Sequence, residues 1–579
     1  MHADLFKSSR GTRSRLRIGL LLDSMTVSRW LAEVIGHISQ SDFAEIALIV
    51  LNNEEQPAAA AEPPRSLPRR IPRVLSDSAR RSKLLFSLYQ KMDSRRVPAS
   101  DDPSAPVDCT ERLRNIESVL VTPMRKGFVH RFPPEAIEQI RAANIDVLLR
   151  FGFNILRGDV LTAAKYGVWS YHHGDNDDYR GGPPHFWEVY EGNPISGVIL
   201  QVLTEQLDAG RVLCKGLFST QPGISVALNR VQPYWGASTF VIQKLHELHE
   251  SGWEHLEKNT VPPAAYRGKK KLYTTPSNQE MVRWLAPVIV RKAARRLIRK
   301  NIIEHWRLAI RIGPKALPGA ANNPDMNGFR WIESPRGQFY ADPFLIGAEG
   351  KAWLFFEDYD YETQRGRISC GEIRDGSLVD VRPALECNYH LSYPCVFHDD
   401  GAIYMIPETS SSGAVELYRC VRFPDEWKLD RILFHGRAVD TTVYAHNGLY
   451  WFFVTIQEPH GFATQLWLFY AESLIGEWIR HPANPISTDV RNSRGAGAIF
   501  LHNGKLYRPS QDCGQHYGYS FTFNQILAMN QREYRESPAV TVLPTWSEGM
   551  VGTHTYSSLG DIEVIDGCAA KPAGHVLSA

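Results

Sequence analysis

Five short, aromatic-rich segments recur at regular intervals beyond residue 327, and they constrain the fold more than any other feature. These segments begin at Asp342, Tyr393, Asp440, Ala496 and His554. The first four are each followed by a turn and a second strand, with Asn-Gly hairpin signals at 447–448 and 503–504. A strand-rich repeat of about 50 residues is typical of propeller blades. The sequence therefore predicts an all-β five-bladed propeller over residues 327–579.

The first half of the chain follows a different pattern, in which apolar runs alternate with helical spacing. Residues 17–22 and 46–51 are typical of buried strands, and residues 27–39 between them have helical periodicity. This alternation predicts an α/β doubly wound, Rossmann-like domain over residues 1–265, with ligands at the carboxyl ends of its strands. Residues 23–25 are Asp-Ser-Met rather than a glycine-rich loop, so a dinucleotide is not indicated.

Two further segments differ from both halves. Residues 54–108 are rich in Ala, Pro, Arg and Ser and are expected to form a flexible insertion with one short helix near 83–92. Residues 266–326 are expected to form a basic helical linker, with a helix from Pro287 to Arg311 that starts at the proline. The favoured interpretation is an interdomain helix with a solvated basic face. The alternative is peripheral contact with an anionic membrane surface, or with a phosphorylated substrate.

Composition narrows the functional classes. A formal net charge of +2 over 579 residues provides no basic footprint for nucleic-acid binding, so a small-molecule substrate is expected. The 8 cysteines are scattered without paired motifs. This favours reduced thiols and a cytoplasmic location, with a bridged secreted protein as the alternative. No apolar run reaches the roughly 18 residues of a membrane span. The oligomeric state is left open.

Residues 167–175, Gly-Val-Trp-Ser-Tyr-His-His-Gly-Asp, carry the strongest indication of chemistry. A strand ending at His172, a polar loop, a helix and a second strand ending near Asp208 would bring an imidazole and a carboxylate together. Such a pair serves general acid/base catalysis, with the carboxylate holding the tautomer of the ring. The plainer interpretation is a loop histidine and a turn aspartate. The surrounding residues favour the acid/base pair.

Those surroundings resemble the formyltransferases that use 10-formyltetrahydrofolate, a family that includes methionyl-tRNA, glycinamide ribonucleotide and nucleotide-sugar formyltransferases. The resemblance covers roughly residues 115–220 and rests on 170–172 (Ser-Tyr-His), 179–181 (Tyr-Arg-Gly) and 207–210 (Leu-Asp-Ala-Gly). It implies 10-formyltetrahydrofolate as co-substrate, with catalytic roles for His172, Asp208 and Ser170. It implies that the folate site contains Phe151, Gly152, Phe153 and Asn154. It implies that substrate contacts come from His173, Asn176, Tyr179, Arg180 and Gly181.

Two positions depart from the family pattern, because Ser170 and His173 stand where the family has Asn and Pro. The resemblance implies that the Asn amide donates to the oxygen that becomes negative during transfer, and losing one such donor costs about 2.7–4 kcal/mol. Ser170, alone or through a water, His173 or Asn176 could replace it, and loss of formyl transfer is the remaining possibility. No metal is expected, because His172, His173 and His185 lack a ligand spacing and nearby cysteines.

The repeated segments resemble the five-bladed propellers of furanose-active glycoside hydrolases, including family 43, and the N-terminal domain of plant glucosamine inositolphosphorylceramide transferases. The resemblance covers roughly residues 327–565 and rests on 341–344 (Ala-Asp-Pro-Phe) and 468–478. It implies that Asp342 is a base and Glu408 an acid in glycoside hydrolysis. An equally weighted alternative is a propeller that only binds a sugar. The residues expected at the axis are Asp342, Glu357, Tyr393, Glu408, Asp440 and His554.

The two resemblances together imply a multidomain transferase. It would move a formyl group from 10-formyltetrahydrofolate to an amino sugar or glycoconjugate precursor, with a sugar or nucleotide sugar as the small-molecule substrate. The main alternative is a hydrolytic, glycosyl-transferring or carbohydrate-binding propeller that carries a degenerate formyltransferase domain. A non-catalytic carbohydrate-binding scaffold is a third possibility.

Overall fold

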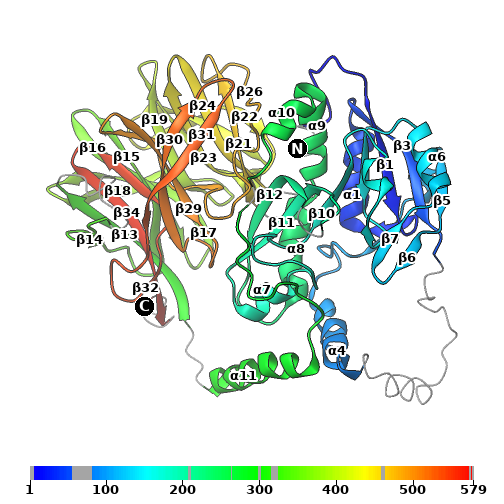
Figure 1. The fold of residues 1–579 in the computed structure, drawn as a ribbon. Helices are drawn as coiled ribbons and strands as arrows, with labels where there is room; N and C mark the ends of the chain where they lie inside the picture. Colours follow the sequence, from blue (N-terminus) through cyan, green and yellow to red (C-terminus); the bar gives the residue numbers. More distant parts are fainter. Residues whose placement is uncertain are drawn as a thin grey trace. The chain divides into compact units, whose positions relative to one another are not determined.

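The computed structural model describes residues 6–54, 81–206, 210–262, 264–297, 302–313, 324–457, 463–572 and 576, with backbone alone at 289, 291–297, 302 and 463. Its contacts divide the chain into two compact units, Met1–Arg295 and Arg296–Ala579. Each unit is described by itself (Figure 1).

The first unit is built on a seven-stranded sheet in the order β12-β11-β10-β8-β1-β3-β5. Its strands are β1 (Leu16–Leu22), β3 (Ala44–Asn52), β5 (Ser118–Val121), β8 (Val147–Arg150), β10 (Val168–His172), β11 (Ile195–Val202) and β12 (Arg211–Ser219). The five strands from β10 to β5 run parallel, β11 pairs antiparallel with β10, and β12 pairs antiparallel with β11. From β1 the chain proceeds to β3 on one side and later to β8 on the other, so the carboxyl ends of β1 and β8 form a topological switch point.

Helices and two small sheets complete this unit. The helices are α1 (Arg29–Gln40), α4 (Leu84–Asp93), α5 (Thr110–Leu113), α6 (Pro134–Ala142), α7 (Phe186–Glu191), α8 (Val226–Ala237), α9 (Phe240–Ser251), α10 (Trp253–Lys258) and α11 (Asn278–Leu297). The small sheets pair β2 (Thr26–Ser28) with β4 (Pro106–Asp108), and β6 (Met124–Lys126), β7 (Val129–Arg131) and β9 (Ile155–Leu156). Leu21, Leu48 and Leu148 from the central strands share one apolar core with Ile140 of α6. None of the described helices has both the length and the apolarity needed to cross a membrane.

The expectation of a flexible insertion over residues 54–108 is wrong for the part that the structure describes. Residues 81–108 contain α4 and β4, and the expected short helix is present. Phe86 packs edge to face against Phe186 at 5.3 Å between ring centroids, and the Tyr89 hydroxyl donates to the Ile224 carbonyl. Long-range burial of two aromatic residues holds this segment against the domain, a contact that its Pro-rich and Arg-rich composition conceals.

The expectation of a helix from Pro287 to Arg311 is also wrong. Helix α11 begins at Asn278, ends at Leu297 and contains Pro287 in its interior. Its start is a capping box, because the Ser277 hydroxyl and the Glu280 backbone amide contact each other at 3.3 Å while the Glu280 carboxylate accepts from the Ser277 amide at 2.8 Å. Residues 302–312 form strand β13 of the second unit.

The second unit consists of antiparallel sheets that follow one another along the chain. Four of them are β15–β18 (Gln338–Ala348, Lys351–Asp360, Arg365–Arg374, Ser377–Leu385), β19–β22 (Ser392–Asp399, Ala402–Glu408, Ala414–Arg422, Glu426–His435), β23–β26 (Ala438–His446, Leu449–Gln457, Ala463–Ala471, Ile479–Arg480) and β27–β31 (Arg494–Gly495, Phe500–His502, Lys505–Asp512, Ser520–Met529, Tyr534–Val542). These are four propeller blades, each starting at one of the repeated segments.

The fifth blade combines the two ends of the unit. It pairs β13 (Ile302–Ile312) and β14 (Arg330–Ile332) with β32 (Met550–Gly552), β33 (Tyr556–Leu559) and β34 (Ile562–Pro572). Figure 1 shows the red strand β34 beside β13, and the two are in register from Ile302 to Ile312. Ala309 and Tyr556 share a core with Phe523 of the fourth blade, whereas Leu308 and Val564 share another with Tyr340 of the first. The fifth blade therefore contacts both the fourth and the first, and the predicted all-β five-bladed propeller fold is confirmed.

The repeat has a backbone signature at its innermost strands. Asp342, Tyr393 and Asp440 have φ values of 51°, 46° and 51°, and Gly497 of the fourth blade has a φ of 119°. In the first three blades the register of the inner strand shifts at the same place. These are β-bulges, which bend a strand and re-aim a side chain. They turn the three side chains toward the propeller axis.

Candidate functional site

A row of polar side chains crosses three strands of the first unit. Ser170 of β10 lies opposite Arg150 of β8 and opposite Gln201 of β11. Residues that face one another across strands lie on the same side of a sheet, and so does His172, two residues beyond Ser170. All four side chains line one cavity of about 730 Å³. The structure thus brings His172 and Ser170 into one pocket with two residues that the sequence analysis missed.

His172 is held by a backbone carbonyl. Its Nε2 lies 2.9 Å from the carbonyl oxygen of Tyr179. A carbonyl only accepts, so Nε2 carries the proton, and in the neutral ring Nδ1 carries the lone pair. A Cβ placed on Gly174 would lie 3.0 Å from Nε2 of His172 and 3.1 Å from that carbonyl oxygen. The glycine therefore leaves room for this contact.

Arg150 joins the Ser170 strand to the loop after β8. Its Nη1 donates to Ser170 Oγ at 3.1 Å, and its other nitrogens donate to the carbonyls of Phe153 at 2.9 Å and Asn154 at 3.1 Å. The Ser170 hydroxyl in turn donates to the Tyr171 carbonyl at 3.2 Å. Because a hydroxyl has a single proton to donate, Ser170 has no second proton for a substrate oxygen in this arrangement.

Gln201 differs from Ser170 in this respect. Its side chain is buried, and its Oε1 has no hydrogen-bond partner among the described residues. Leaving a buried polar atom unpaired costs about 1–3 kcal/mol. This oxygen is shielded from solvent and lies against Gly210, where a Cβ would come within 2.7 Å of it. The sequence did hold a signal, since Gln201 is the one amide in the mostly apolar strand β11. Arg150 stands directly before the loop that was expected to bind folate.

The loop that was expected to bind folate, residues 151–154, lies beside this cavity. Arg150 and Ile155, on either side of residues 151–154, line the cavity. Phe153 has a φ of 61° and packs into the apolar core, 4.9 Å from Phe132 between ring centroids. Gly152 passes so close to the first strand that a Cβ would lie 2.3 Å from the Asp23 amide nitrogen. Asn154 is exposed and Phe151 half-buried. None of residues 151–154 is itself among the residues that line the cavity, and the ring of Phe153 is buried in the core.

The polar loop after His172 is pinned by cations rather than open to the cavity. The Lys215 ammonium of β12 bridges the carboxylates of Asp175 at 2.5 Å and Asp177 at 2.6 Å. The Asn176 carbonyl accepts from Arg180 at 3.1 Å, and the guanidinium of Arg180 stacks over Tyr266 at 4.5 Å. None of these side chains is among the cavity-lining residues. They shape the loop that carries Tyr179 and Gly181.

Of the remaining residues predicted to contact the substrate, Gly181 lines the cavity, whereas Tyr179 and His173 do not. Gly181 lines the cavity and has a φ of 94°, and a Cβ there would lie 2.2 Å from the Tyr273 carbonyl oxygen. The Tyr179 ring is buried, and its hydroxyl donates to Glu191 at 3.2 Å. His173 points to the other side of the sheet and stacks on Tyr234 at 3.9 Å between ring centroids. Burial, His172 and Arg230 lower the pKa of His173 to about 3.

Asp208 lies outside the described residues. The predicted pairing of His172 with Asp208 therefore stays a prediction. The described part of the site already supplies one group that fixes the His172 ring, the Tyr179 carbonyl.

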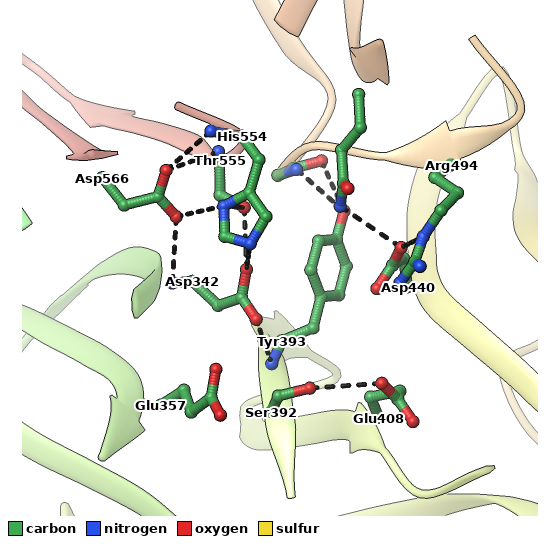
Figure 2. A network of polar contacts seen from close by, with 12 residues as sticks. Asp342, Glu357, Ser392, Tyr393, Glu408, Asp440, Arg494, His554, Thr555 and Asp566 are labelled. Carbon is green, nitrogen blue, oxygen red and sulfur yellow. Dashed lines mark hydrogen bonds and ion pairs between the residues drawn. The ribbon is translucent and has the colours of Figure 1, made fainter. Parts of the chain in front are cut away.

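The second unit has a buried polar network at its axis (Figure 2). One oxygen of Asp342 accepts from the Thr555 hydroxyl at 2.7 Å, and the other accepts from the Tyr393 amide at 3.2 Å. The Asp342 amide donates to Asp566 at 3.3 Å. Burial raises the pKa of Asp342 to about 6, against the opposing influence of His554. The sequence analysis missed Thr555 and Asp566, which lie on the blade that joins the two ends of the unit.

His554 is clamped between two carboxylates. Its Nδ1 lies 2.5 Å from Asp566, its Nε2 lies 3.7 Å from Asp342, and its ring stacks on Trp306 at 4.0 Å between centroids. Burial lowers the pKa of His554, but the carboxylates of Asp566 and Asp342 outweigh it and the net pKa is raised. Within the described part of the chain, Asp342, His554 and Asp566 are the group whose ligand-type atoms lie within 4.8 Å of one another. An imidazole whose pKa is raised by two neighbouring carboxylates forms charge-assisted contacts with them.

The other predicted axial residues have separate partners. Asp440 is paired with Arg494 at 2.6 Å, and the Tyr393 hydroxyl contacts Thr442 at 2.9 Å. Glu408 accepts from the Ser392 hydroxyl at 3.2 Å. Burial, with Asp342 and Glu408 nearby, raises the pKa of Glu357 well above its usual range. The predicted residues do gather near the axis (Figure 2), and the geometry does not single out Glu408 as an acid.

The strand pairing defines a two-part protein, with a doubly wound α/β unit followed by a five-bladed propeller. Residues 326–555 match the family model for the N-terminal part of glucosamine inositolphosphorylceramide transferase 1. That transferase from Arabidopsis thaliana is 38% identical over 207 residues, which are 34% of this chain and 27% of the relative. The methionyl-tRNA formyltransferase of Geobacillus thermodenitrificans (strain NG80-2) is 35% identical over 81 residues, 14% of this chain and 25% of the relative. The resemblances expected from the sequence are confirmed. The chain spans about a quarter of the length of these relatives.

Two solved structures are also similar. Glycinamide ribonucleotide transformylase 1 from Symbiobacterium toebii is 14% identical, covering 46% of this chain and 100% of its own, with a TM-score of 0.28. The catalytic domain of the family 62 α-L-arabinofuranosidase from Coprinopsis cinerea is 13% identical, covering 45% of this chain and 97% of its own, with a TM-score of 0.31. The strand pairing within each unit defines its fold independently of these similarities.

Proposed function

We propose that the first unit transfers a formyl group from 10-formyltetrahydrofolate to the amine of an amino sugar or glycoconjugate precursor. The observation that supports this best is the convergence of His172 with the row Arg150, Ser170 and Gln201 in a single cavity. A histidine beside several polar hydrogen-bonding side chains is what acyl transfer to an amine requires.

The cavity suits a folate-sized co-substrate. Its volume of about 730 Å³ falls in the range of small-molecule sites. When bound, 10-formyltetrahydrofolate would supply the formyl carbon. In this proposal Arg150 and Ile155, which line the cavity on either side of residues 151–154, would hold it.

His172 is the proposed proton carrier. The new bond joins the acceptor nitrogen to the formyl carbon, and the bond to the folate nitrogen breaks. One proton leaves the acceptor nitrogen and is delivered to the departing nitrogen. His172 Nδ1 is the basic atom of the neutral ring because Nε2 is committed to the Tyr179 carbonyl. In this proposal Asp208 adds a negative charge that favours the protonated ring.

Gln201 is proposed to supply the amide that the family's asparagine provides and that Ser170 lacks. The Ser170 proton is directed to the Tyr171 carbonyl, and neither His173 nor Asn176 lines the cavity. Gln201 stands opposite Ser170 and carries an amide whose two ends exchange by a half turn, so its NH₂ group can face the carbonyl oxygen that gains charge. The Arg150 guanidinium next to Ser170 supplies positive charge on the same wall.

The acceptor class is proposed from the second unit. A carbohydrate-type propeller in the same chain favours a sugar-bearing amine over tRNA, in agreement with the balanced net charge. The test is to incubate the full chain with 10-formyltetrahydrofolate and a panel of amino sugars and nucleotide amino sugars, and to measure tetrahydrofolate release. Turnover that is lost in His172→Ala and kept in the surface control His255→Ala supports the proposal. Absence of turnover with every acceptor contradicts it.

The second candidate function is sugar binding or hydrolysis at the propeller axis. The specific observation in its favour is the pair of buried carboxyl groups, Asp342 and Glu357, whose pKa values are both raised. Glycosidases need one carboxyl group kept protonated as an acid. Asp342 already accepts hydrogen bonds on both oxygens, which favours binding over a role as base. Release of sugar from furanosides that is lost in Asp342→Asn and kept in His172→Ala would establish hydrolysis instead.

A further inference from the structure

Helix α4 presents an apolar row to solvent. Leu84, Leu88 and Met92 are four residues apart, and the exposed fractions of the last two are 51% and 70%. Side chains at i, i+4 and i+8 lie on one face of a helix. The opposite face is buried, where Phe86 packs on Phe186 and Tyr89 packs on Trp284 of α11. Among the residues that the structure describes in this unit, none covers the apolar row.

The charge around this row is positive. Between residues 81 and 96 the chain has five basic residues, Arg81, Lys83, Lys91, Arg95 and Arg96. The acidic residue in the same segment, Asp93, is buried: it accepts from the Ala227 amide at 2.8 Å, lies 2.9 Å from the Tyr89 hydroxyl oxygen and pairs with Arg96 at 3.6 Å. The exposed charges on α4 are thus of one sign. An exposed apolar row flanked by basic side chains is the pattern of a helix that lies in the surface of an anionic bilayer.

The same helix forms part of the cavity wall. Lys83, Phe86 and Gln90 line the cavity that contains His172. On another part of the cavity wall, Phe128 projects from the β6–β7 hairpin with 73% of its surface exposed. Two basic residues, Arg125 and Lys126, precede it in that hairpin and are exposed. Exposed apolar side chains with basic neighbours therefore flank the cavity on two separate elements.

We infer that α4 and the tip of the β6–β7 hairpin dock the first unit onto an anionic lipid surface, with the mouth of the cavity near that surface. Docking itself needs no formyl transfer. Its consequence for the substrate rests on the proposed function: the acceptor amine would be carried by a lipid or held at the lipid surface. This surface differs from the basic segment at residues 287–311, because it is apolar at its centre and belongs to the cavity wall.

The test is flotation of the full chain with vesicles of phosphatidylcholine alone and with added phosphatidylglycerol. Binding is expected only to the anionic vesicles and is expected to weaken with salt. The double variant Leu88→Asp/Met92→Asp should weaken binding by about tenfold or more, as should Phe128→Ser. Reversal of Lys91 and Arg95 to Glu should weaken it by about fivefold or more for each charge.

Matched controls lie on the propeller, where Leu501 is 61% exposed and Arg532 is also exposed. Leu501→Asp and Arg532→Glu should leave binding unchanged, and thermal unfolding should show that every variant is folded. Equal binding by all variants, or no binding by the unaltered chain, overturns the inference. Loss of binding only in Arg295→Glu/Arg296→Glu assigns it to the end of α11 and overturns it as well. A dimer in light scattering that Leu88→Asp/Met92→Asp dissolves, without vesicle binding, shows a second copy as the partner instead.

Failure of docking and failure of the proposed function remain distinguishable. Leu88 and Met92 do not line the cavity, so Leu88→Asp/Met92→Asp should leave turnover of a soluble acceptor unchanged. Vesicle binding is measured without folate or acceptor. Binding to anionic vesicles without turnover of any acceptor would support the docking surface and contradict the formyl-transfer proposal.

Discussion

Nε2 of His172 lies 2.9 Å from the backbone carbonyl oxygen of Tyr179, across a loop closed by Gly174. This contact fixes the tautomer of the imidazole by backbone geometry. The carbonyl holds the ring but adds no full negative charge, so the protonated ring is stabilised less than by a carboxylate.

Gly174→Ala should reduce turnover without unfolding the protein. Its Cβ would lie 3.0 Å from His172 Nε2, which is tighter than ordinary van der Waals contact, so the imidazole must move. A shift of this kind in a proton carrier costs about tenfold to a hundredfold in kcat. Steady-state kinetics with a soluble acceptor measures the effect. Gly192→Ala, where a Cβ meets nothing within 4 Å but φ is 66°, controls for general strain. An unchanged kcat in Gly174→Ala would argue against His172 as the proton carrier.

Gln201→Leu should lower kcat by about a hundredfold to a thousandfold, with a smaller effect on KM. The substitution keeps the size of the side chain and removes the amide, and the loss of one oxyanion donor has this magnitude. Gln139→Leu, on the exposed side of α6, is the matched control. Adding Ser170→Asn to Gln201→Leu should restore part of the activity, because it returns an amide to the neighbouring strand. Full activity in Gln201→Leu would remove Gln201 from the mechanism.

The stability of the propeller should fall as the pH rises from about 4 to about 6. Burial raises the pKa of Asp342 from 3.8 to about 6, so the folded state binds the proton more tightly than the unfolded state. That stabilisation is complete below pH 3.8 and is lost as the pH passes 6, with a ceiling of about 3 kcal/mol. Urea unfolding at several pH values measures it. Asp342→Asn should flatten the part of the curve that Asp342 contributes, whereas Asp400→Asn, in an exposed turn, should leave it unchanged. A curve that rises over this range would contradict the assignment.

Ala309→Glu should unfold the propeller. Ala309 of β13 is fully buried in the core shared by the fourth and fifth blades. An unpaired carboxylate there costs several kcal/mol, a large part of the stability of a domain. Circular dichroism and proteolysis of the full chain test this. Arg330→Glu, on the exposed edge strand β14 of the same blade, is the control and should stay folded. A folded Ala309→Glu variant would mean that β13 is dispensable for closure.

Both architectures could be predicted from local patterns in the amino-acid sequence. Alternating apolar runs and helical spacing are local signals, and they predicted the α/β unit. The spacing of Asp342, Tyr393 and Asp440 predicted the blades, and each of these residues stands at a bulge with positive φ. Motifs of a few residues were enough to place His172 and Ser170 beside a cavity.

Contacts between distant segments could not be predicted in this way and are seen in the folded chain alone. Strand β13 looked like the end of a basic helix because its pairing partner, β34, lies more than two hundred residues away, and no local pattern encodes such a pairing. The same holds for Gln201, whose position opposite Ser170 depends on the register of two antiparallel strands. A sequence specifies local propensity and repetition directly, but which distant side chains meet is fixed by burial and strand register in the folded chain.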